Sequence, residues 1–279
     1  MIVASMEHSE YNFKRCKLCK ELSAEPTYHL TDSTIYCCRK CDFHFLNHLD
    51  CPASPPDKTI KLDHKHRTYI ESRLDENAHL HLNRLKCVQH HLNLSGYQAL
   101  DIGAGLGQFQ RLLEAQGAEA VGIEPSMIRR DYTLEAFGIT LHPELVDADY
   151  WQKGFHRYFD LITLWDVIEH VDFPRETLAA ASKLLKPGGM LFLDTPSREV
   201  LSYRLSQWCY QLLPGKVGLF LPSFYSTARY GHKQIFTRQQ LTELFKSVDL
   251  QIIFSARSYT GKPFSNSKII LAGRKIEPV

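Results

Sequence analysis

The sequence lacks the features that would place the chain in a membrane or outside the cell. None of its 279 residues belong to a run near the roughly 18 consecutive apolar residues of a membrane-spanning helix. Residues 1–14 have neither a basic start nor a continuous apolar stretch, so they do not resemble a signal peptide. We therefore expect a cytoplasmic protein, in which eight cysteines are not expected to form a disulfide framework.

The sequence also lacks a charge excess of either sign. Its 33 Lys and Arg residues nearly balance 31 Asp and Glu residues, which leaves a formal net charge of +2. No global field would draw this chain to nucleic acid, and we expect no such partner. The length and the 44% hydrophobic content suffice for one full α/β domain and a smaller appendage.

Four cysteines near the N-terminus have the spacing of a zinc site. Cys16 and Cys19 form one C-x2-C pair, Cys38 and Cys41 form another, and 18 residues separate the pairs. Four thiolates complete a tetrahedron around Zn²⁺ and leave no open position, so the metal would be structural. Cys37 could replace Cys38, and free buried thiols are the competing interpretation.

The chain divides into three parts by composition. Closely spaced prolines at 51–56 predict a linker that ends a zinc module at residues 1–52. Apolar residues from Ile70 to Leu92 fall mostly at helical intervals, which predicts one or two amphipathic helices in a lid at residues 53–96. Residues 97–279 would form the main domain.

The start of the main domain predicts a nucleoside-binding site. A buried strand at 98–102 breaks into Gly103-x-Gly105-x-Gly107 before a helical pattern, so the backbone can approach a ligand closely. Glu124 ends the next strand, 21 positions past Gly103, where a carboxylate can accept hydrogen bonds from ribose hydroxyls. Residue 108 is Gln, which does not fit the G-x-G-x-x-G pattern of a dinucleotide site.

This loop resembles the first motif of class I S-adenosylmethionine-dependent methyltransferases, and the segments 159–171 and 184–196 resemble that family's fourth and fifth strands. The resemblance implies an α/β, Rossmann-like, seven-stranded sheet over residues 97–279, with an insertion at about 198–230. It also implies that Asp101 orients the loop and the methionine ammonium. The implied S-adenosylmethionine contacts are Asp101, Gly103, Ala104, Gly105, Glu124, Pro125, Trp165 and Asp166.

Candidate catalytic residues come from two further resemblances. Glu169 and His170 resemble the Glu-His pair of ubiquinone-type O-methyltransferases, which lies near the acceptor and can bind a divalent ion. His232 resembles the histidine of sugar and polysaccharide methyltransferases, although Gly231 stands where they commonly have an acidic residue. We expect His232 to be the base, with structural roles for both histidines as the alternative. Tyr69 resembles a tyrosine on the lid of sugar C-methyltransferases.

The insertion at 198–230 is rich in apolar residues. It could line an acceptor pocket, touch lipid, pack into the core or form a dimer contact. The whole layout resembles methyltransferases with an N-terminal zinc module, which implies methylation of a small molecule or glycan at oxygen or carbon. The alternatives are a catalytically silent, zinc-containing interaction protein on the same fold and a nicotinamide-dependent oxidoreductase.

Overall fold

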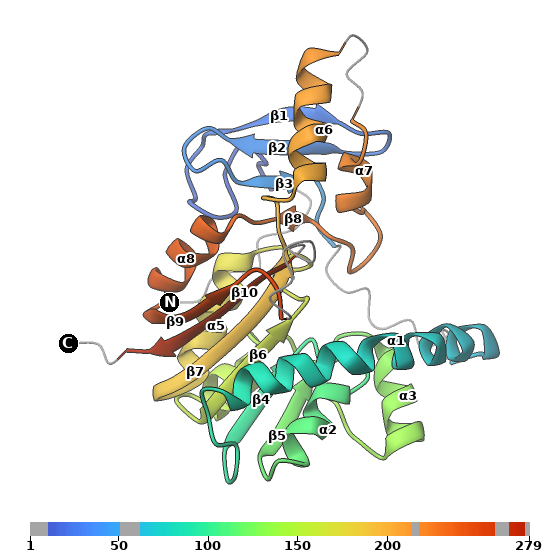
Figure 1. The fold of residues 1–279 in the computed structure, drawn as a ribbon, viewed down its shortest axis with the longest axis vertical. Helices are drawn as coiled ribbons and strands as arrows, with labels where there is room; N and C mark the ends of the chain where they lie inside the picture. The colour runs from blue at the N-terminus through green and yellow to red at the C-terminus, as the bar shows by residue number, and fades with distance from the viewer. Residues whose placement is uncertain (1–10, 51–61, 214–217, 260–267, 277–279) are drawn as a thin grey trace.

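The structure is a computed structural model that describes residues 11–50, 62–213, 218–259 and 268–276 (Figure 1). Its described strands form one sheet of six strands, in the order β5-β4-β6-β7-β10-β9, and one of four, in the order β1-β2-β3-β8. The predicted linker at 51–56 lies outside the described residues.

The large sheet carries the predicted Rossmann-like fold. Strands β4, β5, β6 and β7 are parallel, β10 pairs antiparallel to β7, and β9 pairs antiparallel to β10. These strands are nearly continuous apolar runs, as expected where helices cover both faces. Their bounds are β4 Gln98–Ile102, β5 Glu119–Ile123, β6 Phe159–Trp165, β7 Leu185–Pro196, β9 Leu250–Ala256 and β10 Lys268–Lys275. The associated helices are α2 Gln108–Glu114, α3 Met127–Phe137, α4 Asp149–Gly154, α5 Pro174–Leu184 and α8 Arg238–Lys246.

The predicted number of seven strands is wrong for the described residues. Beyond β5, the place of a seventh strand is taken by a single parallel bridge between Ile123 and His142. His142 donates its backbone N–H to Gly122 and accepts from that of Glu124. The next two backbone groups of the ladder are engaged elsewhere: the Glu124 C=O accepts from the Arg130 guanidinium at 2.7 Å, and the Ser126 N–H donates to the Glu124 side chain at 2.9 Å, so the pairing ends here.

The predicted lid is one helix, α1 (His64–Gln89). The Asp63 side chain caps its first turn by accepting from the backbone N–H of His66. The helix lies across α2 and α3 (Figure 1). Apolar residues recur on the side of α1 that faces the sheet, and Leu85 and Val88 among them are buried. This one-sided burial explains the helical spacing in the sequence.

The small sheet combines three strands from the N-terminal region with one strand from the C-terminal half of the chain. Strands β1 (Ala24–His29), β2 (Thr34–Cys38) and β3 (His44–Leu46) come from the N-terminal region, and β8 (Gln234–Ile235) pairs with β3. The sheet therefore draws its fourth strand from beyond residue 52. Helices α6 (Leu201–Leu212) and α7 (Leu221–Phe224), from the predicted insertion, stand beside this sheet (Figure 1). In the part of the chain that is described, every helix is too short or too polar to span a membrane.

Candidate functional site

The glycine loop follows β4 and turns into α2. Gly103, Gly105 and Gly107 all have positive φ angles, of 72°, 58° and 67°. A Cβ at Gly103 would come within 2.4 Å of a Val167 methyl group, whereas a Cβ at Gly105 would meet nothing within 4 Å. Glycine at position 103 therefore allows the loop after β6 to approach closely. The space beside Gly105 is open, as a bound ligand would require.

Two buried carboxyl groups flank this loop. Glu124 accepts hydrogen bonds from the backbone N–H groups of Gly105 and Ser126, both at 2.9 Å, so its carboxylate faces the loop. Asp101 accepts a 2.6 Å hydrogen bond from the Thr163 hydroxyl. Burial raises the pKa of Asp101 to about 7, and burial also raises the pKa of Glu124. Both carboxyl groups therefore lie beside the glycine loop, near the carboxyl ends of the neighbouring parallel strands β4 and β5.

The other predicted cofactor contacts lie around the same loop. Ala104 donates its backbone N–H to Ile123, which ties the loop to the end of β5 next to Pro125. The Trp165 ring is buried and meets the Phe109 ring edge-on at 5.2 Å. The guanidinium of Arg84, from α1, lies 5.3 Å from the centre of the Trp165 ring, so Trp165 contacts both α1 and α2.

An ion-pair network that the sequence reasoning missed crosses the carboxyl ends of β6 and β7. Arg84 of α1 donates to both carboxylate oxygens of Asp194, at 2.8–3.0 Å, and is also paired with Asp166. Lys268 is paired with Asp166 from the start of β10, and the Tyr259 hydroxyl donates to Asp194. In the sequence, only the position of Asp194 near the end of a buried strand points to this network. Its partners come from segments far away in the sequence, so the pairs themselves could not be predicted.

The three strongest catalytic candidates meet at one place. One ligand atom from each of Glu169, His170 and His232 lies within 4.8 Å of the others, and the two imidazole centroids are 4.6 Å apart. Glu169 is fully buried: its Oε2 accepts from the Thr195 hydroxyl at 2.9 Å, and its Oε1 lies 3.8 Å from His170 Nε2. One carboxylate and two imidazoles could act on protons or hold a divalent cation.

Burial sets the charge of this cluster. Desolvation raises the pKa of Glu169 well above its ordinary value. It lowers the pKa of His170 to about 4 and also lowers the pKa of His232. All three groups are therefore biased toward their neutral forms, and each imidazole keeps a lone pair that can accept a proton.

Backbone contacts fix the position of His232. Its C=O accepts from Ser226, and the N–H of Lys233 donates to the C=O of Glu169 at 2.8 Å. A Cβ at Gly231 would lie only 2.6 Å from the Ser226 carbonyl oxygen, so an acidic side chain does not fit there. The carboxyl group beside His232 comes instead from Glu169, across the cluster.

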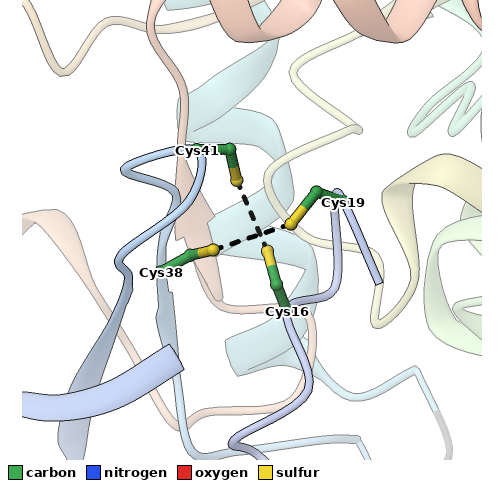
Figure 2. A group of neighbouring side chains, drawn as sticks. All are labelled: Cys16, Cys19, Cys38 and Cys41. Carbon is green, nitrogen blue, oxygen red and sulfur yellow. Dashed lines mark hydrogen bonds between the residues drawn. The ribbon is translucent and has the colours of Figure 1, made fainter. Parts of the chain in front are cut away.

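The four predicted cysteines gather as expected. Their side chains point toward a common centre (Figure 2), with Sγ–Sγ distances of 3.6 Å for Cys16–Cys41 and for Cys19–Cys38. A tetrahedron with Zn–S bonds of about 2.3 Å has edges of about 3.8 Å, so the cluster fits this metal. Tyr69 lies within α1, but its side chain is outside the described residues.

Comparison with known proteins agrees with this geometry. The family described as "Methyltransferase domain" matches residues 64–254. The ubiquinone biosynthesis O-methyltransferase of Burkholderia vietnamiensis is 32% identical over 139 residues, which cover 47% of this chain and 60% of that protein. That of Methylococcus capsulatus is 32% identical over 127 residues, covering 44% and 53%. The match thus spans less than two thirds of these relatives.

A solved structure extends the likeness in fold to most of the chain. The 1,6-didemethyltoxoflavin-N1-methyltransferase of Burkholderia thailandensis, solved with S-adenosylhomocysteine, covers 91% of this chain and all of its own, with a TM-score of 0.50 and 16% identity. At that identity the likeness concerns the fold alone. Because the family match covers more than half of the sequence, the chain belongs to the methyltransferase-domain family of class I S-adenosylmethionine-dependent methyltransferases.

Proposed function

We propose that the chain transfers the methyl group of S-adenosylmethionine to an oxygen or an acidic carbon of a small molecule. The observation that carries this proposal is the cluster of Glu169, His170 and His232, at the same sheet edge as the glycine loop. Val167 contacts Gly103, and Glu169 follows two residues later. A short segment therefore links the methyl-donor site to the cluster.

The chemistry assigns a role to each side chain. The bound cofactor would supply an electrophilic methyl group, and an acceptor hydroxyl must lose its proton to become a good nucleophile. His232 or His170, neutral because of burial, would take that proton. Glu169, held by Thr195 and with its Oε1 3.8 Å from His170 Nε2, would orient the His170 imidazole.

Methyl transfer can be measured with S-adenosylmethionine labelled in its methyl group. The acceptor panel would contain catechols and phenolic acids, as the ubiquinone-biosynthesis relatives suggest, and nucleotide sugars, as the resemblance to sugar methyltransferases suggests. We expect transfer to at least one class, and a rate reduced about 100-fold or more by His232→Ala or His170→Ala. The affinity for S-adenosylhomocysteine should hardly change.

The matched control is His156→Ala, because His156 is exposed in the turn before β6. It should leave the rate unchanged. If His232→Ala and His170→Ala were both as active as this control, neither histidine would be the base. If the protein bound S-adenosylhomocysteine but methylated no acceptor class, the alternative of a catalytically silent interaction protein would be favoured.

A further inference from the structure

A buried lysine binds the backbone on both sides of the cluster of Glu169, His170 and His232. Lys233 follows His232 directly, and its side chain is fully buried. Its Nζ donates to the C=O of His170 at 3.0 Å and, at 3.4 Å, to the C=O of Gly231. One ammonium group therefore joins the two segments that carry the histidines.

The charge of this lysine is compensated by Asp50, which lies shortly after β3. Asp50 Oδ2 accepts from Lys233 Nζ at 2.8 Å and from the backbone N–H of Tyr230 at 3.0 Å. With the two carbonyl groups, the Asp50 carboxylate gives the three N–H donors of the ammonium three acceptors. A buried charge is costly unless it is paired, so the folded protein should keep this contact.

Asp50 is also hydrogen-bonded to the segment that carries His170. Its backbone N–H donates to the carboxylate of Asp172 at 3.1 Å, two residues beyond His170. The backbone N–H of Leu46, at the end of β3, donates to the C=O of Lys233 at 2.7 Å. The chain at and after β3 therefore contacts both histidine segments, although it lies more than 100 residues before either of them.

The competing explanation is that Gln234 alone holds the two segments together. Its Nε2 donates to the C=O groups of Ile168 and Val171, at 2.9 and 2.6 Å. These bonds fix the loop after β6, but the turn before His232 receives its side-chain contacts from Asp50 and Lys233. The two explanations predict different effects of removing Asp50.

We propose that Asp50 and Lys233 are positioning residues that hold the imidazoles of His170 and His232 in place for proton removal from the acceptor. The ring centroids are 4.6 Å apart, and each ring is carried by a segment that this pair binds. A displacement of about 1 Å in such a site can reduce the rate about 100-fold. The kinetic consequence rests on the proposed function, whereas the effect on the position of the rings does not.

Steady-state kinetics of the full chain tests the kinetic consequence. Asp50→Ala should lower kcat at least tenfold and change the affinity for S-adenosylhomocysteine less than twofold. Asp50→Asn should restore most of the rate, because its amide oxygen can still accept from Lys233 and Tyr230. Lys233→Met, which removes Nζ but keeps a long side chain, should act as Asp50→Ala does. The double variant should be no slower than the slower single variant, because both changes remove the same contact.

Asp42→Ala is the matched control. Asp42 comes from the same N-terminal region and is paired with Arg198, whose side chain is 6% exposed. Its removal therefore also takes an ion-pair partner from a buried cation, and it should lower Tm as Asp50→Ala does. We expect its kcat to stay within twofold of the wild type, at a temperature where all variants keep the native circular dichroism spectrum.

The position of the rings can be measured without any methyl transfer. In protein labelled with ¹⁵N-histidine, the imidazole NMR signals of His170 and His232 can be assigned from their alanine variants. Asp50→Ala and Lys233→Met should shift both sets of signals, and Asp42→Ala should leave them in place. If Asp50→Ala does not fold, Lys233→Met provides the same comparison.

The proposal is overturned if Asp50→Ala and Lys233→Met leave the signals of both histidines unchanged. It is equally overturned if these variants are as active as Asp42→Ala, because Gln234 would then be sufficient. Shifted signals in a protein that methylates no acceptor would support the positioning role and contradict the proposed function.

Discussion

The Arg84–Asp194 pair should make a large contribution to the stability of the fold. Asp194 is fully buried, and the Arg84 side chain is 4% exposed. Breaking a buried pair by removing one partner typically costs about 3–5 kcal/mol, because it leaves an uncompensated charge. In Asp194→Asn, Arg84 keeps Asp166 as a partner, so we expect about 3 kcal/mol. For a chain of this size that corresponds to a fall in Tm of roughly 6–12 °C.

Thermal unfolding followed by circular dichroism measures this effect. Asp149→Asn is the matched control, because it breaks the Lys153–Asp149 pair on the surface, whose side chains are 76% and 81% exposed. Such exposed pairs contribute about 0.3–0.5 kcal/mol. Replacing both buried charges, with Arg84→Met and Asp194→Leu together, should be less destabilising than Asp194→Asn alone. Equal shifts in Tm for Asp194→Asn and Asp149→Asn would refute the reasoning.

Three further predictions follow from the site. Burial raises the pKa of Asp101 to about 7, so the cofactor-free protein holds a proton there below that pH. If the ionised form meets the methionine ammonium, S-adenosylhomocysteine should bind about tenfold more weakly at pH 6 than at pH 8, and calorimetry in two buffers should show proton release on binding at pH 6. Asp101→Asn should abolish this pH dependence, and a dependence that persisted would contradict the assignment. Elemental analysis should find one zinc per chain, lost in a Cys16→Ser, Cys19→Ser variant but kept in Cys209→Ser; a metal content equal in both would exclude the four-cysteine site. Gly231→Ala should force a shift of the segment beside Ser226 and slow methyl transfer at unchanged cofactor affinity, and a normal rate would show that the position of His232 is not critical.

The sequence predicted those parts of the fold and site in which local pattern determines position. The glycine loop, Glu124 and the four cysteines are examples. Their atoms come together because the residues are close in the sequence, so their positions depend little on distant segments. The fold class and the gathering of the four cysteines were therefore predictable. The seventh strand was not, because the length of this edge pairing depends on how the Glu124 C=O and the Ser126 N–H are hydrogen-bonded, which the sequence does not indicate.

The long-range part of the site could not be predicted. Arg84 is 110 residues from Asp194, and a charged residue in an amphipathic helix is normally solvated. Glu169 and His232 were singled out separately, but their proximity depends on hydrogen bonds from Lys233 and Gln234 to the segment around Glu169, which is more than 60 residues away in the sequence. The steric exclusion of an acidic side chain at Gly231 likewise depends on a backbone turn that the sequence does not indicate.

Calorimetric titration with S-adenosylhomocysteine tests the central claim most directly. We predict one site per chain with micromolar affinity. In Glu124→Gln the loss of charged hydrogen bonds, each about 1.5–3 kcal/mol, should weaken binding by about 10- to 100-fold. Glu119→Gln, at the exposed start of the same strand, should bind normally. If the wild type gave no binding heat and no thermal stabilisation with this ligand, the chain would not hold a methyl donor and the proposed function would be wrong.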